Sequence, residues 1–272
     1  MERKAAGGVE EVRGEGVESM NDLFTGKSKE EVAIERIKAF CPPEGYWVGI
    51  SGGKDSSVIN DLVIRSGVKS DFHFHLTSID PPEVIKFVKN YMPHVEIHRP
   101  ASTMWKLIVE NGMPPTRLIK YCCRILKEGG GESRTVVTGI RWEESSRRGK
   151  RKMVEACFRD NRKFYIHPII DWSSEDVWQY IRSHNLPYCQ LYDEGWKRIG
   201  CIMCPENRNR INETKRWPTY KQAYIRALDR ALVVARAKGN KATFSNGEDY
   251  FNWWVTNSRT GKTDPDQTVM FE

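Results

Sequence analysis

The sequence of 272 residues lacks any run of about 18 apolar residues, so it predicts no membrane-spanning helix. Its first 20 residues are rich in glutamate and glycine and contain no apolar stretch of the kind that a secretory signal needs. Apolar residues still make up 39% of the chain, which is enough for a folded core. We therefore expect a soluble, cytoplasmic protein of one or two domains with no membrane partner.

Cysteines that could form a full set of disulfides are also missing, because the chain has an odd number, seven, and no export signal. Four of them form two close pairs, Cys122-Cys123 and Cys201-x-x-Cys204, with 77 residues between the pairs. Four thiolates can enclose a metal centre once the fold brings such pairs together. Zinc and an iron–sulfur cluster both take four cysteines, although a vicinal pair suits a single tetrahedral zinc poorly. Four unrelated core thiols are the alternative.

Acidic residues are fewer than basic ones, 36 against 43, which gives a net charge of +7. This surplus favours anionic partners such as nucleotides, sulfate or nucleic acid. Six basic residues fall within one short segment: Arg141, Arg147, Arg148, Lys150, Arg151 and Lys152. The segment is interpreted either as a contact for phosphates or as a solvated basic loop.

Apolar runs alternate with segments of helical periodicity over the first 205 residues. The runs that predict strands are 46–50, 72–79, 94–98, 135–140 and 164–170. The segments that predict helices are 29–40, 58–63, 82–91, 103–109 and 117–126. This alternation predicts an α/β fold, a mostly parallel sheet of five or six strands with helices on both faces. We expect a flexible tail at 1–28, a nucleotide-binding domain at 29–205, and a mainly helical C-terminal extension at 206–272.

A polar loop with two glycines joins the first predicted strand to the next helix. Its sequence is Ser51-Gly52-Gly53-Lys54-Asp55-Ser56-Ser57. The glycines allow a tight turn and a close approach of the backbone to a ligand, and the helix start attracts an anion. The spacing of a Walker A loop is absent. A plain turn with a helix cap is the alternative, but the strand–loop–helix context favours phosphate binding.

The loop resembles the Ser-Gly-Gly-x-Asp-Ser loop of the PP-loop ATP pyrophosphatases. This resemblance implies an adenine nucleotide alpha hydrolase-like fold that holds the phosphates of ATP or of an adenylyl sulfate, with Mg²⁺ sharing the charge. It implies catalytic roles for Lys54, Asp55 and Ser56. It also implies that phosphates are bound by Ser51, Gly52, Gly53 and Ser57.

The cysteine pairs and their neighbours resemble the signature of adenylyl sulfate reductases that carry a [4Fe–4S] cluster. Tyr121-Cys122-Cys123-Arg124 and Gly200-Cys201-x-x-Cys204-Pro205 carry the match, which spans about residues 48–205. The resemblance implies cluster ligation by Cys122, Cys123, Cys201 and Cys204. It also implies nucleotide contacts from Gly139, Arg141 and Arg148, in a segment similar to the Gly-x-Arg…Ser…Arg segment of these reductases.

Two departures separate the chain from these reductases. The 68 residues after Cys204 contain no cysteine, whereas the reductases carry a catalytic cysteine in a C-terminal tail. The stretch Asp80-Pro81-Pro82-Glu83 is shorter than its counterpart. The chain is more similar to the cluster-containing ATP pyrophosphatase components of DNA phosphorothioation systems, and more distantly to tRNA thiolation enzymes.

Several single residues remain open. Asp80 ends a predicted strand, where a contact to ribose or metal and a helix cap are the two interpretations. Cys189 is a candidate sulfur carrier, whereas Cys41 and Cys157 are expected to be small buried side chains. His73 and His75 share one strand face, and the sequence assigns them no role.

The hypothesis that these observations favour is an ATP pyrophosphatase with a [4Fe–4S] cluster. It would adenylate an oxygen so that sulfur can replace it, in DNA or tRNA, with a sulfur donor such as a cysteine desulfurase. The first alternative is an adenylyl or phosphoadenylyl sulfate reductase that uses an external thiol. The second is an accessory subunit that binds nucleic acid and is held together by zinc.

Overall fold

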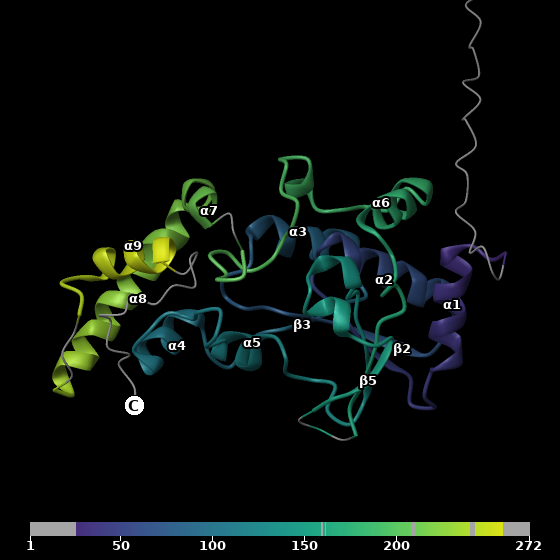
Figure 1. The fold of residues 1–272 in the computed structure, drawn as a ribbon, viewed down its shortest axis with the longest axis horizontal. Coiled ribbons are helices and arrows are strands. Elements are labelled where there is room, and N and C mark those ends of the chain that lie inside the picture. The colour runs from purple at the N-terminus through teal and green to yellow at the C-terminus, as the bar shows by residue number, and fades with distance from the viewer. Residues whose placement is uncertain (1–25, 159, 161, 208–209, 240–242, 258–272) are drawn as a thin grey trace, which may run out of the picture.

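The structure, a computed structural model, describes residues 26–158, 160, 162–207, 210–239 and 243–257, and a six-stranded sheet forms its centre (Figure 1). The strand order is β3-β2-β1-β4-β6-β5. The strands are β1 (Tyr46–Ile50), β2 (Ser70–His75), β3 (Glu96–His98), β4 (Thr135–Val137), β5 (Val154–Ala156) and β6 (Phe164–Ile166). Every neighbouring pair is parallel except β5 and β6, which are antiparallel. The predicted mostly parallel α/β fold is confirmed, with six strands.

Helices lie on both sides of the sheet, with α2 and α3 on one side and α4 and α5 on the other in Figure 1. Those of the α/β part are α1 (Lys29–Ala39), α2 (Lys54–Ser66), α3 (Pro82–Tyr91), α4 (Met104–Asn111), α5 (Tyr121–Leu126) and α6 (Ser174–Ser183). Short 3-10 turns are η1 (Trp142–Glu144), η2 (Arg148–Lys150) and η3 (Gln190–Tyr192). No helix in these described ranges is both long and apolar enough to span a bilayer.

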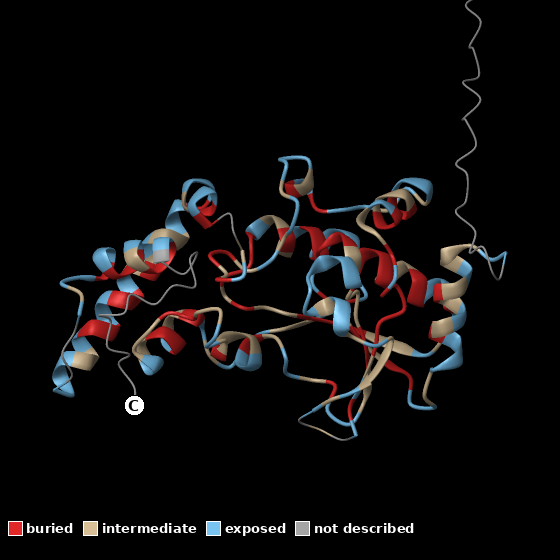
Figure 2. Ribbon diagram, viewed as in Figure 1, coloured by how far each residue is buried: buried red, intermediate tan, exposed pale blue. Residues whose placement is uncertain are grey.

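The core lies between one face of the sheet and α2 and α3. Along β1, Tyr46, Val48 and Ile50 are buried, as the two-residue period of a strand requires. Residues of α2 at helical spacing, from Val58 to Val63, cover this face and are fully buried. Figure 2 shows this buried layer running through α2 and α3. The other face of β1 carries the partly exposed Trp47.

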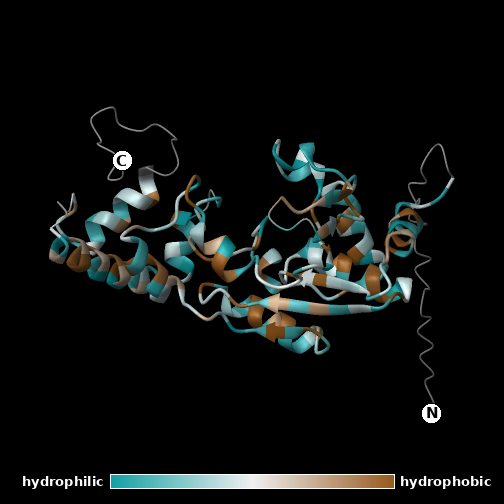
Figure 3. Ribbon diagram, turned by 90° about the horizontal axis from the view of Figure 1, so that it is seen from below, coloured by the Kyte–Doolittle hydropathy of each residue, from teal (hydrophilic) through white to brown (hydrophobic). Residues whose placement is uncertain are grey.

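The C-terminal part consists of α7 (Arg210–Arg216), α8 (Pro218–Ala237) and α9 (Gly247–Asn257). One stripe of α8 is buried, with members three and four residues apart: Tyr224, Ala227, Leu228, Ala231 and Leu232. Hydrophobic and hydrophilic bands alternate along this part of the molecule in Figure 3. The stripe packs on α4 and α9. The helices expected after residue 205 are therefore present, while residues 1–25 of the expected tail and residues 258–272 lie outside the described ranges.

Several strands are shorter than the sequence predicts. The run 72–79 predicts one strand, but β2 ends at His75 and residues 77–80 form a turn with Ser78 at a φ of 65°. The Asp80 carboxylate closes this turn, because its Oδ2 accepts a hydrogen bond from the Thr77 backbone N–H at 2.6 Å. The predicted helix 117–126 starts only at Tyr121.

Candidate functional site

The phosphate loop, residues 51–57, follows the C-terminal end of β1 and leads into α2. Gly52 adopts a φ of 72°, and a Cβ on it would lie 2.5 Å from Val84 Cγ1 of α3. Any other residue would therefore be strained and would clash. Gly53 is the N-cap of α2 without a side-chain cap, so the backbone N–H groups at the helix start face the loop. This arrangement is the one that a phosphate-binding helix start requires.

The serines of the loop bond to the loop itself. Ser56 Oγ donates to the Gly53 carbonyl at 2.8 Å, and Ser57 Oγ donates to the same carbonyl at 3.3 Å. Ser51 Oγ donates to Ser56 Oγ at 3.1 Å. The hydroxyls thus hold the turn rigid before any ligand binds.

Tyr192 is a loop partner that sequence reasoning missed. Its hydroxyl oxygen accepts a hydrogen bond from the Lys54 backbone N–H at 2.8 Å, across 138 residues of sequence. Burial raises the pKa of this hydroxyl well above its usual range. A neutral oxygen thus stands at the start of α2, where an anion would be attracted. No local pattern around residue 192 could have revealed this contact.

Two cations flank the single carboxylate of the loop. Lys54 Nζ lies 2.9 Å from Asp55 Oδ1, and Arg141 Nε lies 2.6 Å from the same oxygen. Lys54 and Arg141 are only 6% and 3% exposed, so both charges act in a poorly solvated setting. Gly139 allows this approach, because a Cβ on it would lie 2.9 Å from the Asp55 carbonyl oxygen.

Arg148 lies one step further from the loop. It forms an ion pair with Glu144, whose other carboxylate oxygen accepts from the Arg141 backbone N–H at 2.9 Å. The structure thus brings Arg141 directly to Asp55 and links Arg148 to the loop through Glu144. Asp80 is buried in the turn after β2 and bonds to Thr77, as described above.

The two cysteine pairs meet in one pocket, here called the cysteine pocket. It is lined by Cys122, Cys123, Cys201, Cys204, Lys127 and apolar neighbours that include Pro115, Met203 and Tyr224. The first pair lies in the first turn of α5. The second pair lies in a turn in which the Cys204 N–H donates to the Cys201 carbonyl at 3.2 Å.

The spacing of the sulfurs separates two kinds of metal centre. A tetrahedral zinc with Zn–S bonds of about 2.3 Å places its sulfurs about 3.8 Å apart. Within the described residues, no three of these cysteine sulfurs lie within 4.8 Å of one another. A four-iron cluster needs its four thiolates at the corners of a larger body, so the donor set fits a cluster better than a single zinc.

Charge in the cysteine pocket favours thiolates. The nearby sulfur of Cys201 raises the pKa of Lys127, and this ammonium in turn offsets negative charge on sulfur. A hydrogen bond from Cys122 lowers the pKa of Cys123, and the charge of Lys127 adds to this effect. Cys189 is buried outside the pocket lining, and burial raises the pKa of its thiol.

One segment, residues 77–84, touches both sites. Thr77 and Ile79 line the cysteine pocket, and the Ile79 carbonyl accepts from the Ile202 N–H at 2.7 Å. Val84, in the first turn of α3, lies directly against Gly52 of the phosphate loop. A nucleotide in the loop and a centre held by the cysteines would therefore be neighbours across this segment.

Comparison with known proteins agrees with this geometry. An uncharacterized protein of Methanocaldococcus jannaschii is 30% identical over 188 residues, which cover 65% of this chain and 46% of that protein. The chain therefore spans less than half of that relative. Adenosine 5'-phosphosulfate reductase of Oceanobacillus iheyensis is 29% identical over 182 residues, covering 61% of this chain and 75% of the reductase.

A solved structure with a similar fold is the phosphoadenylyl-sulfate reductase of Candida auris in its phosphate complex. The TM-score is 0.49 at 20% identity, and the match covers 67% of this chain and 92% of that one. The model of the phosphoadenosine phosphosulfate reductase domain matches residues 45–207, which include the phosphate loop and all four cysteines of the pocket. By this match over more than half of its length, the chain belongs to the phosphoadenosine phosphosulfate reductase domain family.

Proposed function

We propose that the chain is an ATP pyrophosphatase that adenylates an acceptor oxygen so that sulfur can replace it. The observation that carries this proposal is the shared segment 77–84, which sets the phosphate loop beside four convergent thiols. Loop and thiols together suit a reaction that joins nucleotide chemistry to sulfur chemistry. The domains proposed are the nucleotide-binding part at 29–205 and the helical extension after it.

The residues of the loop divide the work on the nucleotide. The N–H groups at the start of α2 and the ammonium of Lys54 would receive the charge that develops on pyrophosphate. Asp55 supplies a carboxylate oxygen of the kind that Mg²⁺ prefers, and Arg141 holds this carboxylate in place at 2.6 Å. Ser51, Ser56 and Ser57 keep the loop in its binding conformation through the bonds described above.

The cysteine pocket would hold a [4Fe–4S] cluster through its four thiols. Such a cluster supplies electron transfer or a site for sulfur when it is bound. The protein's part is to supply four converging sulfurs, an apolar wall and the compensating charge of Lys127. A cysteine desulfurase is the kind of donor that would provide the sulfur.

A nucleic acid is the acceptor that the surface charge supports. Arg147, Lys150 and Lys152 are exposed on the segment that follows Arg141. Exposed cations on a loop next to the nucleotide site suit a phosphate backbone. We propose DNA or tRNA as this acceptor, in a reaction of the DNA phosphorothioation type.

A sulfonucleotide reductase that uses an external thiol is the second candidate. The identity with the Oceanobacillus iheyensis reductase favours it. The described helices α7, α8 and α9 contain no cysteine, so the attacking thiol would have to come from another molecule or from residues not matched to these helices.

Product analysis separates the two candidates. Anaerobic protein is incubated either with ATP and Mg²⁺ in the presence of DNA or tRNA, or with adenylyl sulfate and a thiol. We expect AMP and pyrophosphate from ATP, and little sulfite from adenylyl sulfate. Lys54→Ala should abolish turnover, whereas Lys69→Ala, an exposed lysine before β2, should not. Sulfite without pyrophosphate would establish the reductase, and ADP with orthophosphate would refute both.

Metal analysis tests the cysteine pocket separately. We expect about four irons per chain after anaerobic purification, as a [4Fe–4S] stoichiometry requires. Replacing any one of the four pocket cysteines by serine should lower the iron content, whereas Cys41→Ser should leave it unchanged. One tightly bound zinc without iron would favour the accessory subunit that binds nucleic acid.

A further inference from the structure

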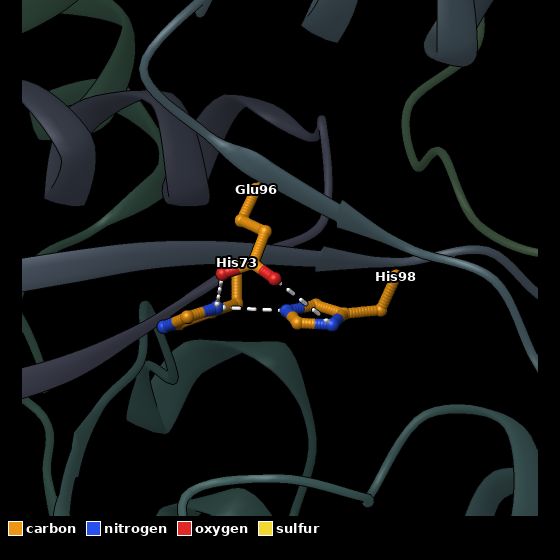
Figure 4. Close-up of side chains that lie close together, drawn as sticks. All are labelled: His73, Glu96 and His98. Carbon is orange, nitrogen blue, oxygen red and sulfur yellow. Dashed lines mark hydrogen bonds and ion pairs between the residues drawn. The ribbon is translucent and has the colours of Figure 1, made fainter.

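Three side chains that commonly bind metals converge on the face of the sheet away from its buried core. They are His73 of β2 and Glu96 and His98 of β3 (Figure 4). The parallel register pairs His73 with Glu96 and His75 with His98, so these side chains share one face. His73 Nδ1 lies 2.8 Å from His98 Nε2 and 3.6 Å from Glu96 Oε2.

These separations are close to those of a bound transition metal. Metal–nitrogen bonds of about 2.0–2.1 Å at tetrahedral angles place ligand atoms about 3.3 Å apart. In the structure one ligand atom from each of the three residues lies within 4.8 Å of the other two. Movements of a few tenths of an ångström would therefore bring two imidazoles and one carboxylate onto one ion.

The outer partner of His73 fixes the tautomer that such a site needs. His73 Nε2 lies 2.5 Å from Asp71 Oδ2, and Arg134 Nη2 lies 2.6 Å from the other oxygen of Asp71. The ion pair keeps Asp71 a carboxylate, so His73 Nε2 carries the proton and donates it. The lone pair of Nδ1 then points toward His98 and Glu96. A carboxylate behind a ligating histidine is the usual second layer of a metal site.

Stacked rings fix the planes of both imidazoles. Trp47 stacks on His73 with ring centroids 3.3 Å apart and planes 10° apart. His75 stacks on His98 with centroids 4.6 Å apart and planes 18° apart. The rings are thus held in position, so a metal would lose little conformational freedom of the ligands on binding.

Solvent reaches the three side chains from a surface hollow. The hollow has a volume of about 520 Å³, and Asp71, His73 and Glu96 line it together with His94. The side chain of Glu96 is 67% exposed. Three protein ligands beside open solvent leave a coordination position for water or a small ligand.

We propose that His73, Glu96 and His98 form a binding site for a divalent transition metal such as Zn²⁺, separate from the cysteine pocket and the phosphate loop. In the metal-free protein the proton of His98 Nε2 lies between the two imidazoles. The ion replaces this proton, and His98 takes a proton on Nδ1 instead. Nitrogen and oxygen ligands of this kind suit zinc, nickel or copper rather than magnesium. The proposal does not depend on the proposed function.

Zinc titration of untagged, anaerobically purified protein tests this site. We expect wild type to bind one equivalent of Zn²⁺ more than His98→Ala, because zinc bound by the thiols is common to both and cancels. Asp71→Asn should weaken the same equivalent about 10- to 100-fold, as the loss of a second-layer carboxylate does. His94→Ala is the matched control, since His94 borders the same hollow but bonds to Asn60 instead.

A second measurement identifies the ligands and guards against misfolding. Glu96→Gln changes one exposed carboxylate and should weaken the equivalent at least 10-fold without altering the circular dichroism spectrum. With Co²⁺ as the probe, the equivalent lost in Glu96→Gln should show ligand-field bands without thiolate charge-transfer bands. Equal zinc stoichiometry and affinity in wild type, His98→Ala and Glu96→Gln would overturn the proposal, as would thiolate bands for this equivalent.

Discussion

His167 shows how a single buried side chain makes stability depend on pH. It is fully buried after β6, with Nδ1 2.8 Å from Thr138 Oγ1 and Nε2 3.3 Å from Arg151 Nη2. Burial, reinforced by the charge of Arg151, lowers the pKa of His167 to about 4 from its usual 6.5. The neutral ring accepts from Arg151 and donates to Thr138, and a second ring proton would oppose Arg151.

We predict that His167 costs stability as the pH falls from 6.5 toward 4. In that window the unfolded chain takes up a proton that the folded protein does not, and the cost is absent above 6.5 and constant below 4. The loss at pH 5 should be about 2 kcal/mol. Urea unfolding at pH 7.5 and pH 5.0 measures it. His167→Gln should reduce the difference between the two pH values by this amount, and an unchanged difference would contradict the assignment.

Helix α2 offers two glycines whose comparison tests the phosphate loop at the scale of the element. Gly52 before the helix and Gly67 after it have nearly the same φ, 72° and 70°. A Cβ on Gly52 would lie 2.5 Å from Val84 Cγ1, whereas a Cβ on Gly67 would meet nothing within 4 Å. The two positions therefore share the backbone strain of an added side chain but not the clash.

We predict that Gly52→Ala lowers the free energy of unfolding by more than about 2 kcal/mol and abolishes ATP binding. Gly67→Ala should cost only about 1–2 kcal/mol, the cost of the left-handed conformation, and leave ATP binding unchanged. Thermal unfolding and calorimetric titration with ATP measure both effects. Equal ATP affinity in the two variants would remove the phosphate loop from the nucleotide site.

Local signals explain which elements could be predicted from the sequence. The β1–loop–α2 unit carries its apolar period, its glycines and its helix start within about twenty consecutive residues, and the structure reproduces this unit. Strand β5 was not predicted, because three residues that include Glu155 carry no apolar alternation. The end of β2 at His75 depends on the turn that Asp80 closes, and this hydrogen bond leaves no periodic trace.

Contacts between distant residues set the limit for the candidate site. Spacing alone could group Cys122 with Cys123, and the resemblance to a family joined this pair to the second one. Tyr192 reaches Lys54 across 138 residues, and no motif records that pairing. The convergence of His73 with His98 depends on the strand register, which the sequence does not reveal.

At the scale of the whole molecule, the C-terminal helices support the cysteine pocket from behind. Glu213 of α7 accepts two hydrogen bonds, from the Met203 N–H at 2.7 Å and from Asn207 Nδ2 at 2.6 Å. Tyr224 of α8 donates to the Ile202 carbonyl at 3.1 Å. The turn that carries Cys201 and Cys204 is thus held by residues outside the matched family domain, which ends at residue 207.

We predict that Glu213→Ala destabilises the protein by about 2 kcal/mol, because the buried Met203 N–H loses its acceptor. It should also speed the reaction of the pocket thiols with a disulfide reagent in the reduced, metal-free protein. Glu248→Ala is the control, since that side chain is 62% exposed and pairs only loosely with Lys221. Thiol kinetics identical in the two variants would show that the C-terminal helices do not steady the turn.

The strand order has a consequence for how the molecule is made on the ribosome. Strand β1 lies between β2 and β4, yet β4 is synthesised about 85 residues after β1, so one edge of β1 stays open during that time. The cysteine pairs are separated by 77 residues, and the second pair is synthesised after all six strands. Any metal centre that these thiols hold must therefore be installed late, on a sheet that is already complete.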